Sequence, residues 1–220
     1  GHGGGGYRYE EYKNYLKENN LEHDIDEIAP GCGIVKAPVE ATVPYFLTEN
    51  TLNLIDKFEK EEEPFFIWHN FWGPHAPYNT IEKYIDMYKD VDIPTWPNFE
   101  WPSSEIEGPH RVKLDVNGRE TWSDWEQAIK YYYAFMTAID EQIGRILDHL
   151  EEKGIADNTY VIFTADHGET LGTHGGMVDK GYSHFEEIQR IPLIIKYPEK
   201  KYANTAQSEF VSLTDIYHTI

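Results

Sequence analysis

The sequence predicts an α/β protein, a three-layer α/β/α sandwich with a mostly parallel central sheet that is incomplete in this chain. Apolar runs of strand length alternate with segments of helix length, in the order helix, strand, helix, strand, strand, helix. One long segment carries an apolar stripe with helical spacing. Two of the strands are followed by long excursions rich in glycine, proline and aromatic residues, which are typical of functional loops.

The composition is compatible with a packed core and limits the partners. The chain has 220 residues, of which 40% are hydrophobic and 15% aromatic. A formal net charge of −20 argues against nucleic acid or an anionic membrane surface as a partner, because both would be repelled. An anionic substrate therefore needs a local positive site. The single cysteine, Cys32, excludes an internal disulfide framework and a zinc site built from several cysteines.

Residues 1–44 are predicted to form an irregular N-terminal segment with a truncated start. The glycine-rich stretch 1–6 is typical of a loop or a remnant of cloning. Residues 7–21 have a loosely helical spacing of tyrosines. Residues 29–43 are rich in proline and glycine and predict an irregular crossing segment.

Residues 45–220 are predicted to form part of a catalytic domain, which begins with a helix and a strand. Thr48 is a candidate N-cap for a helix that ends before Pro64. The run Phe65–Trp68 then predicts a strand buried on both faces. Residues 73–101 form a surface excursion with several prolines and with Trp96 and Trp101. These two rings are suited to stack on a sugar or aryl ring, although packing of the loop onto the domain is the simpler expectation.

The clearest helix follows this excursion. Ser123 and Glu126 have the spacing of a capping box, and Gly154 is placed to end the helix. Between them, apolar residues recur every three or four positions: Trp125, Ile129, Tyr132, Met136, Ile139, Ile143, Ile146 and Leu150. The sequence then predicts strands at 160–163 and 192–195, and a last helix capped by Thr214.

The most informative stretch follows the strand at 160–163. Asp166 and His167 offer adjacent oxygen and nitrogen ligands at a strand end, followed directly by a glycine. A carboxylate favours Ca²⁺ or Mg²⁺, and an adjacent imidazole widens the choice toward Mn²⁺ or Zn²⁺. The alternative is a strand-to-loop turn in which Asp166 caps backbone amides and His167 is simply exposed.

Two more residues are candidates for the same crevice, because ligands bind beyond the carboxyl ends of strands in open α/β sheets. Lys180 offers a positive charge for a tetrahedral anion, and His75 offers an imidazole for an ester oxygen or a leaving alcohol. Taken alone, Lys180 is also compatible with a solvated surface lysine and His75 with an ordinary loop residue. His69 suits a core position, and His174 and His184 suit capping or surface positions.

Together these segments resemble the sulfatase family of the alkaline phosphatase superfamily. The resemblance covers most of residues 45–220, in the order and spacing of the family. The matching segments are Pro64–Trp68, Pro74–Tyr78, Asp140–Leu147, Asn158–Glu169, Leu171–Gly175, Lys180–Gly181, Glu186–Glu187, Arg190–Ile195 and Leu213–Tyr217.

The resemblance implies an alkaline phosphatase-like fold and a role for four residues. Asp166 and His167 match two metal ligands, with Ca²⁺ as the first expectation and Mg²⁺ or Mn²⁺ as alternatives. Lys180 matches the lysine that binds the sulfate group. His75 matches the histidine that contacts the sulfate and the leaving-group oxygen. The implied substrate is a small-molecule or carbohydrate sulfate ester.

The chain also departs from the family pattern. The family nucleophile is a formylglycine made from Cys or Ser in a Cys/Ser-x-Pro-x-Arg motif, and this sequence has no such motif. Cys32 lies in Pro-Gly-Cys-Gly-Ile and lacks the required proline and arginine. The paired N-terminal aspartates of the family and its upstream Lys/His segment are absent too. We therefore expect a central fragment that is inactive alone, with the formylglycine in a missing upstream part.

Two alternatives remain open at this point. One is a phosphate or phosphonate ester hydrolase of the same superfamily, since close relatives share the Asp-His-Gly loop. The other is a non-catalytic domain that binds a metal or a sugar.

Overall fold

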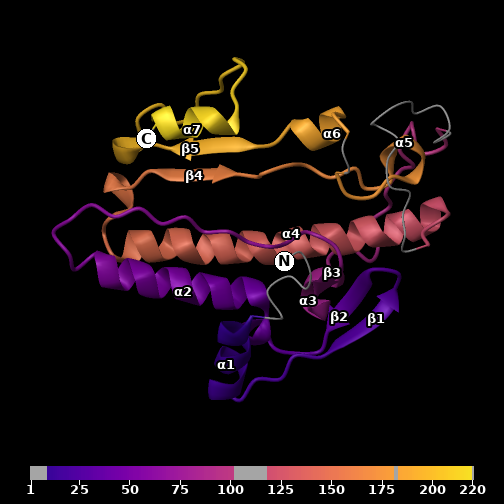
Figure 1. Ribbon diagram of the computed structural model, residues 1–220, viewed down its shortest axis with the longest axis horizontal. Helices are drawn as coiled ribbons and strands as arrows, with labels where there is room; N and C mark the ends of the chain where they lie inside the picture. Colours follow the sequence, from indigo (N-terminus) through magenta and orange to yellow (C-terminus); the bar gives the residue numbers. More distant parts are fainter. Residues whose placement is uncertain (1–8, 102–117, 181–182, 220) are drawn as a thin grey trace.

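The computed structural model describes residues 9–101, 118–180 and 183–219, so the prediction for residues 1–6 and the matched Gly181 lie outside it. Two parallel helices form one layer, α2 (Val43–Phe58) and α4 (Trp122–Glu152). A two-stranded sheet, β4 (Val161–Thr164) and β5 (Leu193–Lys196), lies beside this layer (Figure 1). The predicted α/β architecture is confirmed, with a partial sheet.

The remaining elements are short. They are α1 (Glu10–Glu18), β1 (Ile25–Ala29), β2 (Cys32–Val35), η1 (Val39–Ala41), β3 (Tyr78–Thr80), α3 (Glu82–Ile85), η4 (Ala156–Asn158), α5 (Thr173–Gly176), α6 (Glu186–Gln189), η5 (Pro198–Lys200) and α7 (Leu213–Thr219).

The N-terminal segment is more regular than its composition predicts. Strands β1 and β2 form an antiparallel hairpin, and β2 pairs in parallel with β3. Gly31 has a φ of 68° and allows the tight turn between the first two strands. The prediction of an irregular segment over 29–43 is therefore wrong for Cys32–Val35, because one of the two pairing partners of this short strand, β3, lies more than 40 residues away in the sequence.

Helix α2 begins earlier than predicted. The side chain of Thr42 accepts a hydrogen bond from the backbone N–H of Tyr45, and Pro44 occupies the first turn. Thr48 is fully buried inside the helix and is not its cap. Ion pairs join the far ends of α2 and α4, where Asp56 contacts both His149 and Lys153 at 2.8 and 2.7 Å.

Helix α4 has the predicted apolar stripe and a different cap. The capping box joins Thr121 and Asp124, two residues before the predicted pair Ser123 and Glu126. At the other end, Gly154 has a φ of 69° and its N–H donates to the carbonyl of Glu151, as predicted for the helix end.

The segment 64–70 is extended and half exposed, and the prediction of a strand buried on both faces is wrong. Phe66 and Trp68 are 65% and 68% exposed, whereas Phe65, Ile67 and His69 are half-buried. Among the described residues it has no strand assignment. Ile67 and Val161 of β4 nevertheless pack against one apolar cluster on the helix layer, formed by Ile55, Leu150 and Ala156.

The C-terminal elements largely follow the prediction. Strands β4 and β5 are antiparallel, with Thr164 opposite Leu193. Helix α7 begins one residue before Thr214, and the oxygen that accepts at its start belongs to Ser212 instead, which takes a hydrogen bond from the Thr214 N–H. No helix in the described parts of the chain is both long and apolar enough to cross a membrane.

Candidate functional site

Strand β4 delivers Asp166 and His167 to the start of a loop. The Asp166 carboxylate is 86% exposed and accepts a hydrogen bond from the His167 N–H at 3.1 Å. This contact is the turn capping that the structural alternative expected, but His167 itself is mostly covered. Its Nδ1 lies 2.6 Å from the carbonyl oxygen of Gly168. Since a carbonyl can only accept, Nδ1 carries the proton and a neutral ring then has a lone pair on Nε2.

Lys180 points its ammonium group at this nitrogen. Its Nζ is in hydrogen-bond contact with Nε2 of His167, and its backbone N–H donates to the carboxylate of Asp179 at 2.8 Å. The Asp166 carboxylate lies 3.6 Å from the same Nε2. The Lys180 ammonium group, the His167 lone pair and the Asp166 carboxylate are thus close together, although Lys180 and His167 are 13 residues apart in the sequence. The structure brings the side chains of Lys180 and His167 into contact.

His75 is oriented by its own backbone. Its Nδ1 lies 2.6 Å from the carbonyl of Ala76, so that Nδ1–H is the donor and Nε2 is the nitrogen able to exchange a proton with a ligand. The ring of Trp72 packs beside it, with centroids 5.0 Å apart. The peptide bonds before Pro74 and Pro77 are both cis and shape this turn.

The loop that carries His75 and the loop after β4 both pack against one apolar cluster. Ala76 and Leu171 both pack against the buried group of Cys32, Tyr78, Ala128 and Tyr131. Cys32 is thus buried in β2. The fold therefore brings the two candidate loops to the same region of α4.

Glu169 is a further acidic residue of this region that the sequence analysis did not single out. Burial raises the pKa of its carboxyl group, and the nearby charge of Asp179 adds to the rise. The backbone N–H groups of Thr170 and Leu171 oppose it by donating to Oε1. Burial also raises the pKa of Tyr132 to about 12, with a smaller contribution from the Glu169 charge. In the sequence, the position of Glu169 directly after the Asp-His-Gly tripeptide is the signal that could have marked it as part of this region.

The other histidines and the tryptophans have structural contacts. His69 contacts the Thr51 hydroxyl at 2.6 Å, and burial lowers its pKa, as expected for a core histidine. His184 is exposed, whereas His174 is buried against Glu187 and does not lie at the surface. Trp96 donates its indole N–H to the Leu171 carbonyl at 2.8 Å, which is the packing role expected for the loop.

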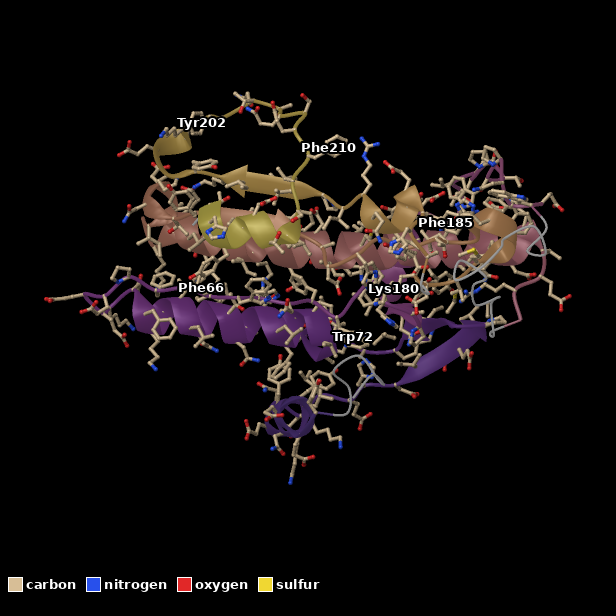
Figure 2. The ribbon with its side chains drawn as sticks, turned by 45° about the horizontal axis from the view of Figure 1, so that its top comes forward. Phe66, Trp72, Lys180, Phe185, Tyr202 and Phe210 are labelled. Carbon is tan, nitrogen blue, oxygen red and sulfur yellow. The ribbon has the colours of Figure 1, made fainter. Side chains whose placement is uncertain are left out.

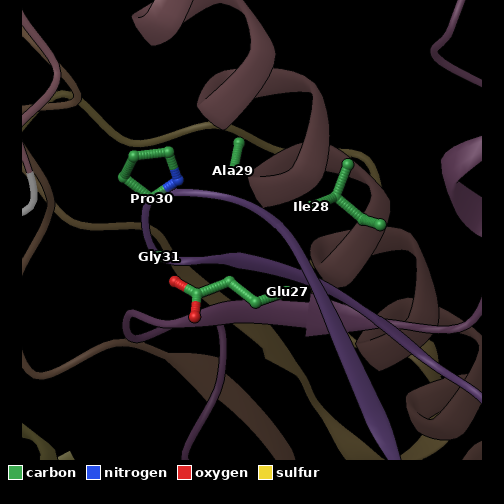
Figure 3. Close-up of a pocket in the computed structure, with 5 residues that line it drawn as sticks. All are labelled: Glu27, Ile28, Ala29, Pro30 and Gly31. Carbon is green, nitrogen blue, oxygen red and sulfur yellow. The ribbon is translucent and has the colours of Figure 1, made fainter.

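Figure 2 shows the side chains of the described chain, and Lys180 and Phe185 lie near the N-terminal half of α4, whereas Phe66 lies near α2 and the C-terminal half of α4. Figure 3 shows an open pocket at the turn between β1 and β2, lined by Glu27, Ile28, Ala29, Pro30 and Gly31. None of the candidate residues lines this pocket; they lie on the loops that follow β4 and precede β3.

Comparison with known proteins gives a consistent result. The family model described as Sulfatase matches residues 4–220. The multifunctional alkaline phosphatase superfamily protein PehA of Trinickia caryophylli is 31% identical over 201 residues, which cover 84% of this chain and 38% of that protein. The N-acetylglucosamine-6-O-sulfatase of Bacteroides thetaiotaomicron is 42% identical over 134 residues, covering 59% of this chain and 23% of that protein.

A solved structure supports the same fold. The phosphonate monoester hydrolase of Agrobacterium radiobacter superposes with a TM-score of 0.69 at 22% identity, covering 86% of this chain and 42% of that one. The chain thus spans well under half the length of these relatives. Because the family model covers nearly all of the sequence, the chain belongs to the sulfatase family, in the alkaline phosphatase superfamily.

Proposed function

We propose that the protein to which this chain belongs hydrolyses sulfate esters in a metal-dependent reaction. The observation that carries the proposal is the cluster of the Asp166 carboxylate, the Nε2 atom of His167 and the Lys180 ammonium group at the end of β4. Such a cluster can bind an anion in a chain whose net charge is −20. Residues 45–220 are then part of the catalytic domain.

The donor set suits a divalent metal. His167 Nε2 presents a lone pair because Nδ1–H is held by the Gly168 carbonyl, the usual outer contact of a metal-binding histidine. The Asp166 carboxylate offers oxygen at 3.6 Å from that nitrogen. Two electron-rich groups this close are stabilised by a cation between or beside them. We assign Asp166 and His167 as ligands for Ca²⁺, with Mg²⁺ or Mn²⁺ as alternatives. When bound, the metal supplies positive charge to the oxygens of the ester.

The protein side chains do the rest of the work at the ester. Lys180 binds an oxygen of the sulfate group through its ammonium hydrogens. His75, when protonated, transfers the Nε2 proton to the departing alcohol oxygen. Its Nδ1–H remains hydrogen-bonded to the Ala76 carbonyl. This assigns His75 and Lys180 as the catalytic and substrate-binding residues in the chain. The formylglycine nucleophile is expected outside these 220 residues.

The ester is proposed to be a small-molecule or carbohydrate sulfate. The N-acetylglucosamine-6-O-sulfatase, 42% identical to this chain where the two align, acts on a sulfated sugar by its name. The second candidate is a phosphate or phosphonate ester. It is favoured by the likeness to PehA and to the phosphonate monoester hydrolase. Lys180 fits either anion, so substrate competition decides between them.

The test uses the full-length protein with an aryl sulfate, a sugar sulfate and a phosphonate monoester as competing substrates. We expect the sulfates to have the higher kcat/KM. Lys180→Ala should lower kcat/KM on the order of 100-fold, the loss seen when one charge-stabilising donor is removed. Lys89→Ala is the matched control, because the Lys89 side chain is exposed and pairs with Asp86 within the same short segment. Equal activity of the Lys180 variant, or a preference for the phosphonate, would contradict the assignment.

The 220-residue chain alone gives a separate prediction. Because the nucleophile and further carboxylate ligands are absent from its sequence, it should hydrolyse no sulfate ester and should bind Ca²⁺ only weakly. Calorimetry with Ca²⁺ and a discontinuous sulfate-release assay measure both. Turnover that Asp166→Ala abolishes, or tight stoichiometric Ca²⁺ binding, would show that the site is complete in this chain.

A further inference from the structure

The loop after β4 carries both His167 and Lys180, and Glu187 holds this loop at two places. The Glu187 backbone contacts the residues next to His167, and the Glu187 side chain contacts His174. The backbone carbonyl of Glu187 accepts from the Glu169 N–H at 3.1 Å, and the next carbonyl, that of Ile188, accepts from the Gly168 N–H at 2.8 Å. The loop after β4 is thereby fixed within one residue of His167.

Gly168 makes this approach possible. A Cβ atom built at this position would lie 1.9 Å from the carbonyl oxygen of Glu187. A side chain is therefore excluded, and the two backbones lie in direct contact. The position of the His167 ring follows from this contact, because the Gly168 carbonyl also holds its Nδ1.

The side chain of Glu187 contacts the same loop a second time, at His174. Both carboxylate oxygens lie 3.2 Å from His174 Nε2, and the imidazole is 8% exposed. The ring also stacks on Phe185, with centroids 3.7 Å apart and planes inclined by 12°. His174 adopts a left-handed backbone conformation with φ 52° and ψ 48°. A non-glycine residue in this region is uncommon and needs support from its surroundings.

Hydrogen bonds also fix the segment between His174 and Lys180. The Thr170 hydroxyl lies within 2.9 and 2.8 Å of the carbonyl oxygens of Met177 and Asp179, and the Gly172 N–H donates to the Met177 carbonyl. Asp179 then accepts from the Lys180 N–H. A series of contacts therefore leads from Glu187 through His174 and along the segment that ends at Lys180, whose ammonium group contacts His167.

We propose that Glu187 and His174 are positioning residues that set the placement of Lys180 against His167. They act through the loop that carries both His167 and Lys180, since their contacts are with each other and with the backbone of this loop. The inference concerns the site described under the proposed function, and its test reads the geometry of that site without turnover, so the two can fail separately.

The experiment follows two signatures of the site in the 220-residue chain. One is the pair of ring ¹⁵N shifts of His167, which report the tautomer and the environment of Nε2. The other is the acylation rate of Lys180 at limiting reagent, measured by peptide mass spectrometry. The variants are Glu187→Ala and His174→Asn, the latter chosen because asparagine tolerates the left-handed backbone. Glu186→Ala is the matched control, since the Glu186 side chain is exposed and pairs with Arg190 at the surface.

We expect both variants to move the His167 ring shifts and to raise Lys180 acylation about fivefold, the factor that one hydrogen bond of ordinary strength provides. The double variant should add little to either single change, because both break the same link. Glu186→Ala should leave both readouts unchanged. If Glu187→Ala does not fold, His174→Asn decides, because it leaves the Glu187 backbone contacts in place. Unchanged shifts and acylation in a folded His174→Asn would overturn the proposal, as would equal effects of Glu186→Ala.

Discussion

At the scale of single residues, the candidate site is organised by proton positions. His75 and His167 each have Nδ1 within 2.6 Å of a nearby backbone carbonyl, of Ala76 and Gly168 respectively. The same local geometry leaves Nε2 of both rings available to ligands. For His167 this nitrogen faces Lys180, and the neighbouring residue Asp166 remains open to solvent.

Glu169 gives a pH-dependent prediction at this scale. Its pKa is raised above the ordinary value of 4.5, so the folded state binds this proton more readily than the unfolded state. Its contribution to stability is therefore present below about pH 4.5 and is lost as the pH rises through the folded pKa. Glu169→Gln keeps an oxygen for the Thr170 N–H and removes the charge. We expect the variant to be more stable than the parent at pH 7, with the difference closing below pH 4.5.

Thermal unfolding between pH 4 and pH 8 measures this difference. Glu62→Gln is the control, because Glu62 is exposed in the loop after α2 and its change should not alter the pH profile. A Glu169→Gln protein that is less stable at pH 7 than at pH 4, relative to the parent, would reverse the sign and contradict the burial of this carboxyl group.

At the scale of elements, the start of α4 separates two capping assignments. Ser123 and Glu126 have the spacing of a capping box in the sequence, but Thr121 and Asp124 form the box in the structure. Thr121→Ala should lower the free energy of unfolding by about 1 kcal/mol, the usual effect of losing an N-cap side chain. That corresponds to a fall in Tm of about 2–4 °C for a chain of this size. Ser123→Ala should have almost no effect, because Ser123 is an exposed residue inside the first turn.

Circular dichroism melts of the two alanine variants test the assignment directly. A larger loss for Ser123→Ala than for Thr121→Ala would restore the cap that the sequence favours. The C-terminal end of α4 has one assignment, since Gly154 has the left-handed φ and the hydrogen bond of a helix end at the predicted position.

At the scale of the whole molecule, the described surface contains an exposed apolar set on segment 64–70, β4 and β5. Phe66, Trp68 and Ile194 are all more than 60% exposed, and Phe163 is partly exposed. Exposed apolar surface of this kind marks an interface or an aggregation site. Among the described residues, β4 is paired on one edge, with β5. We expect the 220-residue chain to bind a hydrophobic dye and to self-associate as its concentration rises.

The double change Phe66→Ser with Trp68→Ser should reduce both effects. Light scattering and dye fluorescence across a concentration series provide the measurement. Ile28→Ser is the control, because Ile28 is half exposed on the separate β1–β2 hairpin. A monomer without dye binding at all concentrations would show that this surface is covered in solution.

Features that depend on local residue pattern could be predicted from the sequence alone. The apolar stripe of α4, its end at Gly154 and the order of the candidate residues along the chain follow from residue spacing and from glycine geometry. These are properties of a few neighbouring residues, so they can be read without the fold. The resemblance in motif order identified the family for the same reason, because it compares linear spacing.

Which residues contact one another depends on the packing of the folded chain. The contact of Lys180 with His167, the burial of His174 against Glu187 and the pairing of Cys32–Val35 with Tyr78–Thr80 all join positions distant in the sequence. Segment 64–70 shows the same limit, since an apolar run predicts burial but its partners decide how much of it is covered. Burial and hydrogen-bond partners are set by the packing of the whole chain, and local pattern constrains them only weakly.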